Sequence, residues 1–308
     1  MSFSDAQIRR LDEILRDVLS DRAEWVESQC GCALRESKSA KNVEATSIHS
    51  AVTHVDRELQ DAVLKAVYSG FPTMIPLVEE DTALAMKYRQ NQGDVAFILD
   101  PIDGTQCFAN GRHDYCTMAA VSVAGRMVYG SVARYHPFDW TNSLTKETTS
   151  TSSDASDSPL KIVCHYRMFR DPYLPITAKL QAANFLSAAV PLDESEYSSN
   201  EDAWNTGNGL GSNGNAILAM LDGHWDAYLA PMVNLHDFAG PLAVAQAAGA
   251  TVIRFETASA EKPKAWLPAG DDSFFVESAS DYPKRFRLLM ARDQDVAKRV
   301  IDEALSLA

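Results

Sequence analysis

Apolar side chains recur every three or four positions in two long segments near the start of the chain. The first runs from Ser4 to about Glu27, with Ser4 placed where an N-cap residue holds the first turn. The second spans residues 52–69 and stops at Gly70 and Pro72, which interrupt a helix. The pattern therefore predicts two long amphipathic helices.

Shorter apolar runs follow, and their composition is typical of strands. Residues 94–99 (DVAFIL) predict a short buried strand, and residues 115–123 and 126–135 flank Ala124-Gly125 as a hairpin. Later segments alternate, and we expect strands at 161–167 and 224–230, helices at 173–186, 214–223 and 237–249, and a strand after Gly249. Strands that alternate with helices favour layered α/β packing.

A Ser- and Thr-rich segment at residues 141–159 separates the two halves of the chain. It is nearly devoid of large apolar side chains, so it cannot contribute to a core. A chain of 308 residues is long enough for two lobes. We expect an N-terminal lobe over residues 1–145, with paired helices on an antiparallel sheet, and a C-terminal α/β lobe over residues 160–308.

The overall charge limits the partners of the chain. A formal net charge of −14 repels nucleic acid and anionic membrane surfaces, and we expect neither as a partner. No run of 18 apolar residues occurs, the N-terminus lacks an apolar leader, and the five cysteines are scattered and odd in number. These features predict a soluble cytoplasmic protein with reduced thiols. Metal ions can still bring a phosphate to an acidic protein.

Two aspartates frame a proline at the end of the predicted strand, in the stretch ILDPIDGTQCFANG. Asp100 stands at the carboxyl end of the strand and Asp103 on the turn, while Gly104 and Thr105 begin a short helix. The two carboxylates repel each other unless cations lie between them, whereas the free N–H groups of the helix start favour an anion. Together they predict a site for a metal-bound phosphate.

Two further carboxylates strengthen this interpretation. Glu79 follows the apolar stretch 75–78, and Asp237 stands at the start of a helix of small residues. Magnesium prefers such oxygen ligands, and two ions that share a carboxylate can hold both the attacking and the leaving oxygen. The predicted chemistry is phosphoryl transfer to water.

The sequence DPIDGT at residues 100–105 resembles, without a change, the most specific motif of the inositol monophosphatase family of magnesium-dependent, lithium-sensitive phosphatases. The resemblance extends over AVTHVD (51–56), VEE (78–80) and HDFAGPLAVAQAAGA (236–250), in the family's order. It implies a layered α/β/α/β/α sugar-phosphatase fold and a homodimer. It also implies a magnesium-dependent phosphate monoester hydrolase that acts on a small polyol or sugar phosphate by two-metal-assisted water attack.

The resemblance also implies roles for individual residues. Two or three Mg²⁺ ions would be held by Glu79, Asp100, the carbonyl of Ile102, Asp103 and Asp237. Asp56, paired with Thr105, would orient and deprotonate the attacking water, and the amides of Gly104 and Thr105 would bind the phosphate. Three more residues are candidates for substrate contact: Ser212 and Asn213 in the loop GLGSNGN, and His236 at the rim of the site.

The residues leave other functions open. Ala230 stands where inositol-specific members carry Glu, and His236 where the family usually has Trp, so adenosine bisphosphate nucleotidase, fructose bisphosphatase and histidinol phosphatase activities stay as alternatives. The haloacid-dehalogenase type of phosphatase uses D-x-D, and the D-x-x-D spacing here disfavours its phosphoenzyme. A further alternative is a catalytically weakened relative that acts as a binding or regulatory protein.

Overall fold

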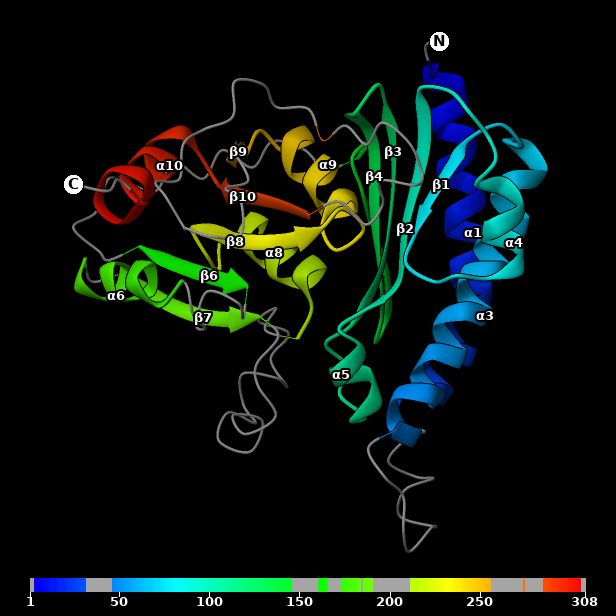
Figure 1. Ribbon diagram of the computed structural model, residues 1–308, viewed down its shortest axis with the longest axis horizontal. Coiled ribbons are helices and arrows are strands. Elements are labelled where there is room, and N and C mark those ends of the chain that lie inside the picture. The colour runs from blue at the N-terminus through cyan, green and yellow to red at the C-terminus, as the bar shows by residue number, and fades with distance from the viewer. Residues whose placement is uncertain are drawn as a thin grey trace, which may run out of the picture.

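The computed structural model of the chain describes residues 3–31, 46–145, 160–165, 173–183, 185–190, 211–255, 274 and 285–305. Its strands form two five-stranded sheets, with helices between the sheets and on their outer sides (Figure 1). From one side to the other the layers read helix, sheet, helix, sheet, helix, which confirms the expected α/β/α/β/α arrangement. Most of the predicted Ser- and Thr-rich boundary, residues 146–159, lies outside the described residues.

The first sheet has the strand order β1-β2-β3-β4-β5. Its strands are β1 (Ile75–Val78), β2 (Val95–Asp103), β3 (Cys116–Val123), β4 (Arg126–Tyr135) and β5 (Phe138–Asn142). The β1–β2 pair is parallel and every other pair is antiparallel. Strands β3 and β4 form the predicted hairpin, and Ala124 and Gly125 at its turn both have positive φ, 48° and 78°.

Helices α1 (Asp5–Gln29) and α3 (Thr46–Gly70) cover the outer face of this sheet. Ser4 caps α1 as predicted, because its side chain accepts the Gln7 amide while Gln7 reaches back to the Ser4 amide. The apolar face of α1, whose residues recur with the period of a helix, is buried against the sheet. It consists of Ile8, Leu11, Leu15, Leu19 and Val26. The short helix α4 (Ala83–Tyr88) follows β1.

One carboxylate oxygen ties α1 to the far edge of the sheet. Oδ1 of Asp12 accepts hydrogen bonds from the Tyr129 hydroxyl at 2.8 Å, the Trp140 indole at 3.1 Å and the Asn142 amide at 2.8 Å. The donors lie on β4 and β5, so a single side chain on the helix fixes it to two strands.

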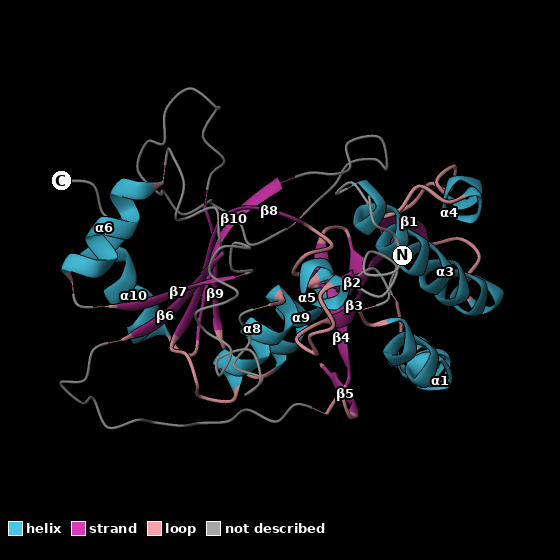
Figure 2. Ribbon diagram, turned by 90° about the horizontal axis from the view of Figure 1, so that it is seen from below, coloured by secondary structure: helices cyan, strands magenta, loops and turns pink. Residues whose placement is uncertain are grey.

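Helices α8 (Asn213–Leu221) and α9 (Ala239–Ala247) form the layer between the two sheets (Figure 2). The α9 backbone lies directly against β4. A Cβ atom added to Gly130 would stand 2.2 Å from the Gly240 carbonyl oxygen, and one added to Gly240 would stand 2.6 Å from the Ser131 carbonyl oxygen. Glycine is therefore required on both sides of this contact.

The second sheet has the strand order β7-β6-β8-β10-β9. Its strands are β6 (Lys161–His165), β7 (Leu186–Val190), β8 (Ala227–Asn234), β9 (Thr251–Phe255) and β10 (Arg285–Ala291). Strand β6 pairs in parallel with β7 and β8, whereas β10 is antiparallel to β8 and β9. Its outer face is covered by α6 (Leu174–Ala182), α10 (Gln294–Val300) and the π-helical turn Ile301–Leu305.

Two of the predicted boundaries were wrong in this half. The helix expected at 173–186 ends at Ala182, and the residues from Leu186 form β7, because they pair with the distant strand β6. The strand expected at 224–230 instead spans Ala227–Asn234. No helix in the described part of the chain is both long and apolar enough to cross a bilayer.

Candidate metal centre

Strand β2 carries two buried carboxylates at its carboxyl end. The strand continues to Asp103 and does not stop near Leu99, and its pairing with β3 is irregular between Asp100 and Asp103. Only 3% of Asp100 and 7% of Asp103 is exposed. In a regular strand successive side chains point to opposite faces of the sheet, and such an irregularity changes the direction of the side chains beside it.

The chain turns sharply after Asp103 at a position that only glycine fits. Gly104 has φ +93°, and an added Cβ would lie 2.8 Å from the Asp114 carbonyl oxygen and 2.9 Å from that of Gly211. The turn leads into the short helix α5 (Thr105–Ala109), and the Thr105 hydroxyl donates to the Ile102 carbonyl at 3.0 Å. That carbonyl keeps a second lone pair for another partner.

Asp56 lies on α3, and only 3% of it is exposed. Its Oδ1 atom accepts no hydrogen bond from the described residues, Thr105 included. The Thr105 hydroxyl donates to Ile102, and the pairing of Asp56 with Thr105 stays a prediction.

The loop before α8 holds Asp103 through three hydrogen bonds. The Ser212 hydroxyl and the Gly214 amide donate to its Oδ2 at 2.6 and 2.7 Å, and the Asn213 amide donates to Oδ1 at 3.3 Å. Ser212 is also the N-cap of α8, since its hydroxyl accepts the Asn215 amide at 3.1 Å. Ser212 and Asn213 are buried, and the structure gives them a positioning role toward Asp103. Their contact with a leaving group stays a prediction.

Asp114 is a part of the site that the sequence did not reveal. Its carboxylate accepts the Gly211 amide at 2.5 Å and the Asn215 side-chain amide at 2.6 Å. These bonds join the loop after α5 to the start of α8, which in turn holds Asp103. No local pattern around Asp114 signals partners that lie 97 and 101 residues further along the chain.

His236 and Asp237 form an ion pair just before α9. The His236 Nε2 atom lies 3.0 Å from Oδ1 of Asp237, and the Asn234 amide donates to Oδ2 at 2.9 Å. Burial acts to raise the pKa of Asp237, but His236 and these hydrogen bonds outweigh it, and the pKa lies below its ordinary value. For His236, burial acts to lower the pKa, but Asp237 outweighs it and the pKa is raised. The pairing therefore keeps Asp237 ionised.

The remaining carboxylates destabilise one another's charge. Burial raises the pKa of Asp100 well above its ordinary value, and the charges of Glu79 and Asp103 raise it further. Burial likewise raises the pKa of Asp103 to about 7, although the bonds from Gly214 and Ser212 oppose the shift. Burial and the neighbouring Glu79 and Glu80 raise the pKa of Asp56.

Glu79 is the exposed member of the group. It follows β1, and its amide continues the pairing with β2 by donating to the Leu99 carbonyl at 3.3 Å. Its pKa is raised, first by desolvation, while the charge of His236 opposes the shift. The Nε atom of Arg57 donates to Oε2 of the neighbouring Glu80 at 3.0 Å, so Glu80 pairs with an arginine.

These residues fit divalent cations. The buried Oδ1 atoms of Asp100 and Asp56 accept no hydrogen bond from any residue that the structure describes, and such atoms are costly unless a cation or donor satisfies them. The charges of Glu79 and Asp103 both raise the pKa of Asp100, and Glu79 also raises that of Asp103. Hard cations with oxygen ligands would meet both needs, and magnesium is one of them.

The sequence profile of the inositol monophosphatase family matches residues 9–286. The chain belongs to the inositol monophosphatase family. The matched range includes the first sheet, strands β6 to β9 and every carboxylate described above, so the DPIDGT resemblance is confirmed at the level of the family.

Solved structures of the family show the same fold at low sequence identity. Staphylococcal IMPase-II is 14% identical with a TM-score of 0.62, and 96% of each chain is covered. Mycobacterium tuberculosis SuhB is 16% identical with a TM-score of 0.57, over 97% of this chain and 99% of that one.

A curated relative, Nus factor SuhB of Pasteurella multocida, is 27% identical over 116 residues. This alignment covers 38% of the present chain and 40% of the relative, so the chain matches less than half of that protein's length.

Proposed function

We propose that this member of the inositol monophosphatase family is a magnesium-dependent phosphate monoester hydrolase that acts on a small polyol or sugar phosphate. The observation that carries the proposal is Asp100, a carboxylate with an unsatisfied buried oxygen, surrounded by further carboxylates at the end of one strand. Burying such a charge is unfavourable unless it holds a cation. Family membership supports phosphate ester chemistry at this place.

Each ion would have its own ligands. Glu79, Asp100 and the Ile102 carbonyl would hold one Mg²⁺, and Asp100, Asp103 and Asp237 would hold a second, with Asp100 shared. When bound, Mg²⁺ polarises a phosphoryl oxygen and makes a water molecule more acidic. A third ion is part of the same proposal.

The chain's own residues would position and activate the reactants. The loop at Ser212 and Gly214 fixes the Asp103 carboxylate, and His236 fixes that of Asp237. We propose that Asp56 and Thr105 orient the attacking water and accept its proton, for which Asp56 has an unoccupied oxygen. The amides of Gly104 and Thr105, at the start of α5, would bind the phosphate.

The test is phosphate release by the purified full chain from a panel of substrates. Inositol phosphates, sugar phosphates, fructose bisphosphate, histidinol phosphate and adenosine bisphosphate would each be offered with Mg²⁺ and with a chelator. We expect magnesium-dependent turnover of one class, lost in Asp100→Asn and kept in Asp17→Asn, an exposed aspartate on α1. Turnover that survives both the chelator and Asp100→Asn would overturn the proposal.

A binding or regulatory protein is the second candidate. Both oxygens of Asp103 and both of Asp237 already accept hydrogen bonds or an ion pair, and one aligned relative is named a Nus factor. Binding of Mg²⁺ together with silence across the whole panel would favour this candidate.

We also propose that the protein is a cytoplasmic homodimer. The family resemblance supports the dimer, and the scattered cysteines support a reducing compartment, since the four described ones are buried free thiols. Sedimentation of the purified chain at micromolar concentration measures the mass directly, and a monomer mass of 33.8 kDa would contradict the dimer.

A further inference from the structure

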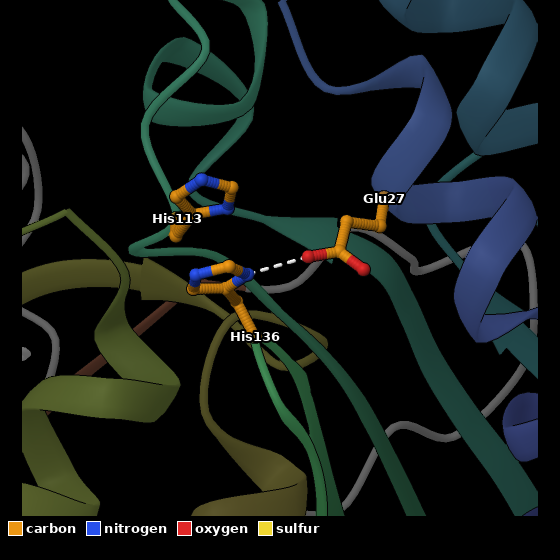
Figure 3. Close-up of side chains that lie close together, drawn as sticks. All are labelled: Glu27, His113 and His136. Carbon is orange, nitrogen blue, oxygen red and sulfur yellow. Dashed lines mark hydrogen bonds and ion pairs between the residues drawn. The ribbon is translucent and has the colours of Figure 1, made fainter.

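A second group of metal-binding side chains lies apart from the carboxylates of β2. It consists of Glu27 in the last turn of α1, His113 between α5 and β3, and His136 between β4 and β5 (Figure 3). One possible ligand atom from each residue lies within 4.8 Å of the others. Glu27 is half-buried and both histidines are exposed, so ions can reach the group from solvent.

The three side chains lie against one another. The imidazole rings of His113 and His136 are stacked, with centroids 3.8 Å apart and planes inclined by 16°. Nδ1 of His136 lies 2.5 Å from Oε1 of Glu27, and Figure 3 shows the stacked rings beside the Glu27 carboxylate. Ligands that stand about 2.1 Å from a tetrahedral zinc ion lie roughly 3.4 Å from one another, so small rotations place all three around one ion.

Hydrogen bonds hold two of the three contributing segments together independently of any ion. The Gly31 amide donates to the Phe108 carbonyl at 2.8 Å, and the Cys30 thiol donates to the Arg112 carbonyl at 3.5 Å. These bonds fix the end of α1 against the loop that carries His113. A site assembled from fixed segments loses little conformational entropy when it binds.

The local electrostatics favour a cation. The last turn of α1 contains no basic residue, although the C-terminal end of a helix carries partial negative charge. Glu27 adds a full negative charge at the same end, which a helix does not otherwise favour. Burial, and then the neighbouring His136, lowers the pKa of His113, which leaves its imidazole neutral and able to donate a lone pair.

We propose that Glu27, His113 and His136 bind one transition-metal ion of the zinc type, with a water molecule as the fourth ligand. Two imidazoles and a carboxylate form an established ligand set for zinc, whereas magnesium prefers oxygen ligands alone. The two metal sites of the molecule would thus select different ions. Because His113 directly precedes Asp114, the ion would also anchor the loop that supports the start of α8.

The experiment uses the full chain, freed of metal by a chelator and returned to a buffer with excess Mg²⁺ to fill the carboxylate centre. Co²⁺ is then titrated and followed by its visible absorption, which is stronger in a tetrahedral site than in an octahedral oxygen site, and zinc is added in competition. We expect one Co²⁺ per chain, displaced by Zn²⁺. His113→Gln, His136→Gln and Glu27→Gln should each weaken binding at least about tenfold.

Two variants serve as controls. His224→Gln removes an exposed histidine elsewhere and should bind as the parent does, and Asp100→Asn alters only the carboxylate centre and should keep the Co²⁺ absorption. Equal binding by the parent and His113→Gln, or no Co²⁺ absorption in the parent, would overturn the proposal. His113 is exposed, so this variant decides the matter even where His136→Gln does not fold. None of these outcomes depends on phosphatase activity.

Discussion

Asp103→Asn should make the metal-free protein more stable while it removes activity. The pKa of Asp103 moves from 3.8 to about 7 on folding. Since each tenfold change in acidity corresponds to about 1.4 kcal/mol, ionised Asp103 costs the metal-free fold roughly 4 kcal/mol. Below about pH 4 the carboxyl group is protonated in both the folded and the unfolded state, so this cost is absent. As the pH rises the unfolded state loses its proton first, and the cost grows until it is complete above about pH 7. Asparagine has nearly the same shape and does not ionise, but its NH2 group cannot accept a hydrogen bond as the carboxylate oxygen does, which offsets part of the gain.

The assay is urea unfolding of the parent and the variant in a chelator at pH 5 and at pH 8. We expect the variant to be more stable by about 2 to 4 kcal/mol at pH 8 and by less than half of that at pH 5. Added Mg²⁺ should stabilise the parent more than the variant, because the variant lacks one ligand. The matched control is Asp17→Asn on the exposed face of α1, which should change neither quantity. Equal stabilities of parent and Asp103→Asn at pH 8 would refute the reasoning.

Three other substitutions test the supports of the site. Ser212→Ala should cost about 1 to 3 kcal/mol in urea unfolding and lower kcat, because one hydroxyl caps α8 and holds Asp103. Gly104→Ala should lower the Tm by several degrees in calorimetry, since its Cβ would clash with backbone at 2.8 Å. Asp12→Ala should cost about 2 to 4 kcal/mol with KM unchanged, because it leaves three donors unpaired far from the metal centre. A parent-like Tm in Gly104→Ala, or a changed KM in Asp12→Ala, would contradict these assignments.

Local chemistry explains which features the sequence predicted. Ser4 caps α1, and Ala124-Gly125 forms a hairpin turn, because neighbouring residues alone decide these features. The positions of Asp100 and Asp103 beside Gly104 follow from one strand and one turn for the same reason. The predicted boundary at 173–186 failed because a distant strand, β6, recruits Leu186–Val190 into a sheet.

The support of Asp103 was beyond local reasoning for a similar reason. Its donors at Ser212 and Gly214 lie 109 and 111 residues away, and Asp114 accepts the Gly211 amide of that same loop. Ser212 and Asn213 were predicted to contact a leaving group because they occupy a Gly-rich loop. In the structure the same two residues bind the Asp103 carboxylate, and their contact with a leaving group stays a prediction.

The contact between Gly130 and Gly240 fixes the distance between the two elements that carry the carboxylates of the metal centre. Asp237 lies just before α9, whereas Asp100 and Asp103 belong to the sheet against which α9 packs. The distance between the two groups of carboxylates is therefore set by a contact between two backbones. A single methyl group at either glycine would push α9 away from the sheet. It would thereby move Asp237 relative to Asp100 and Asp103 without contacting any of the three.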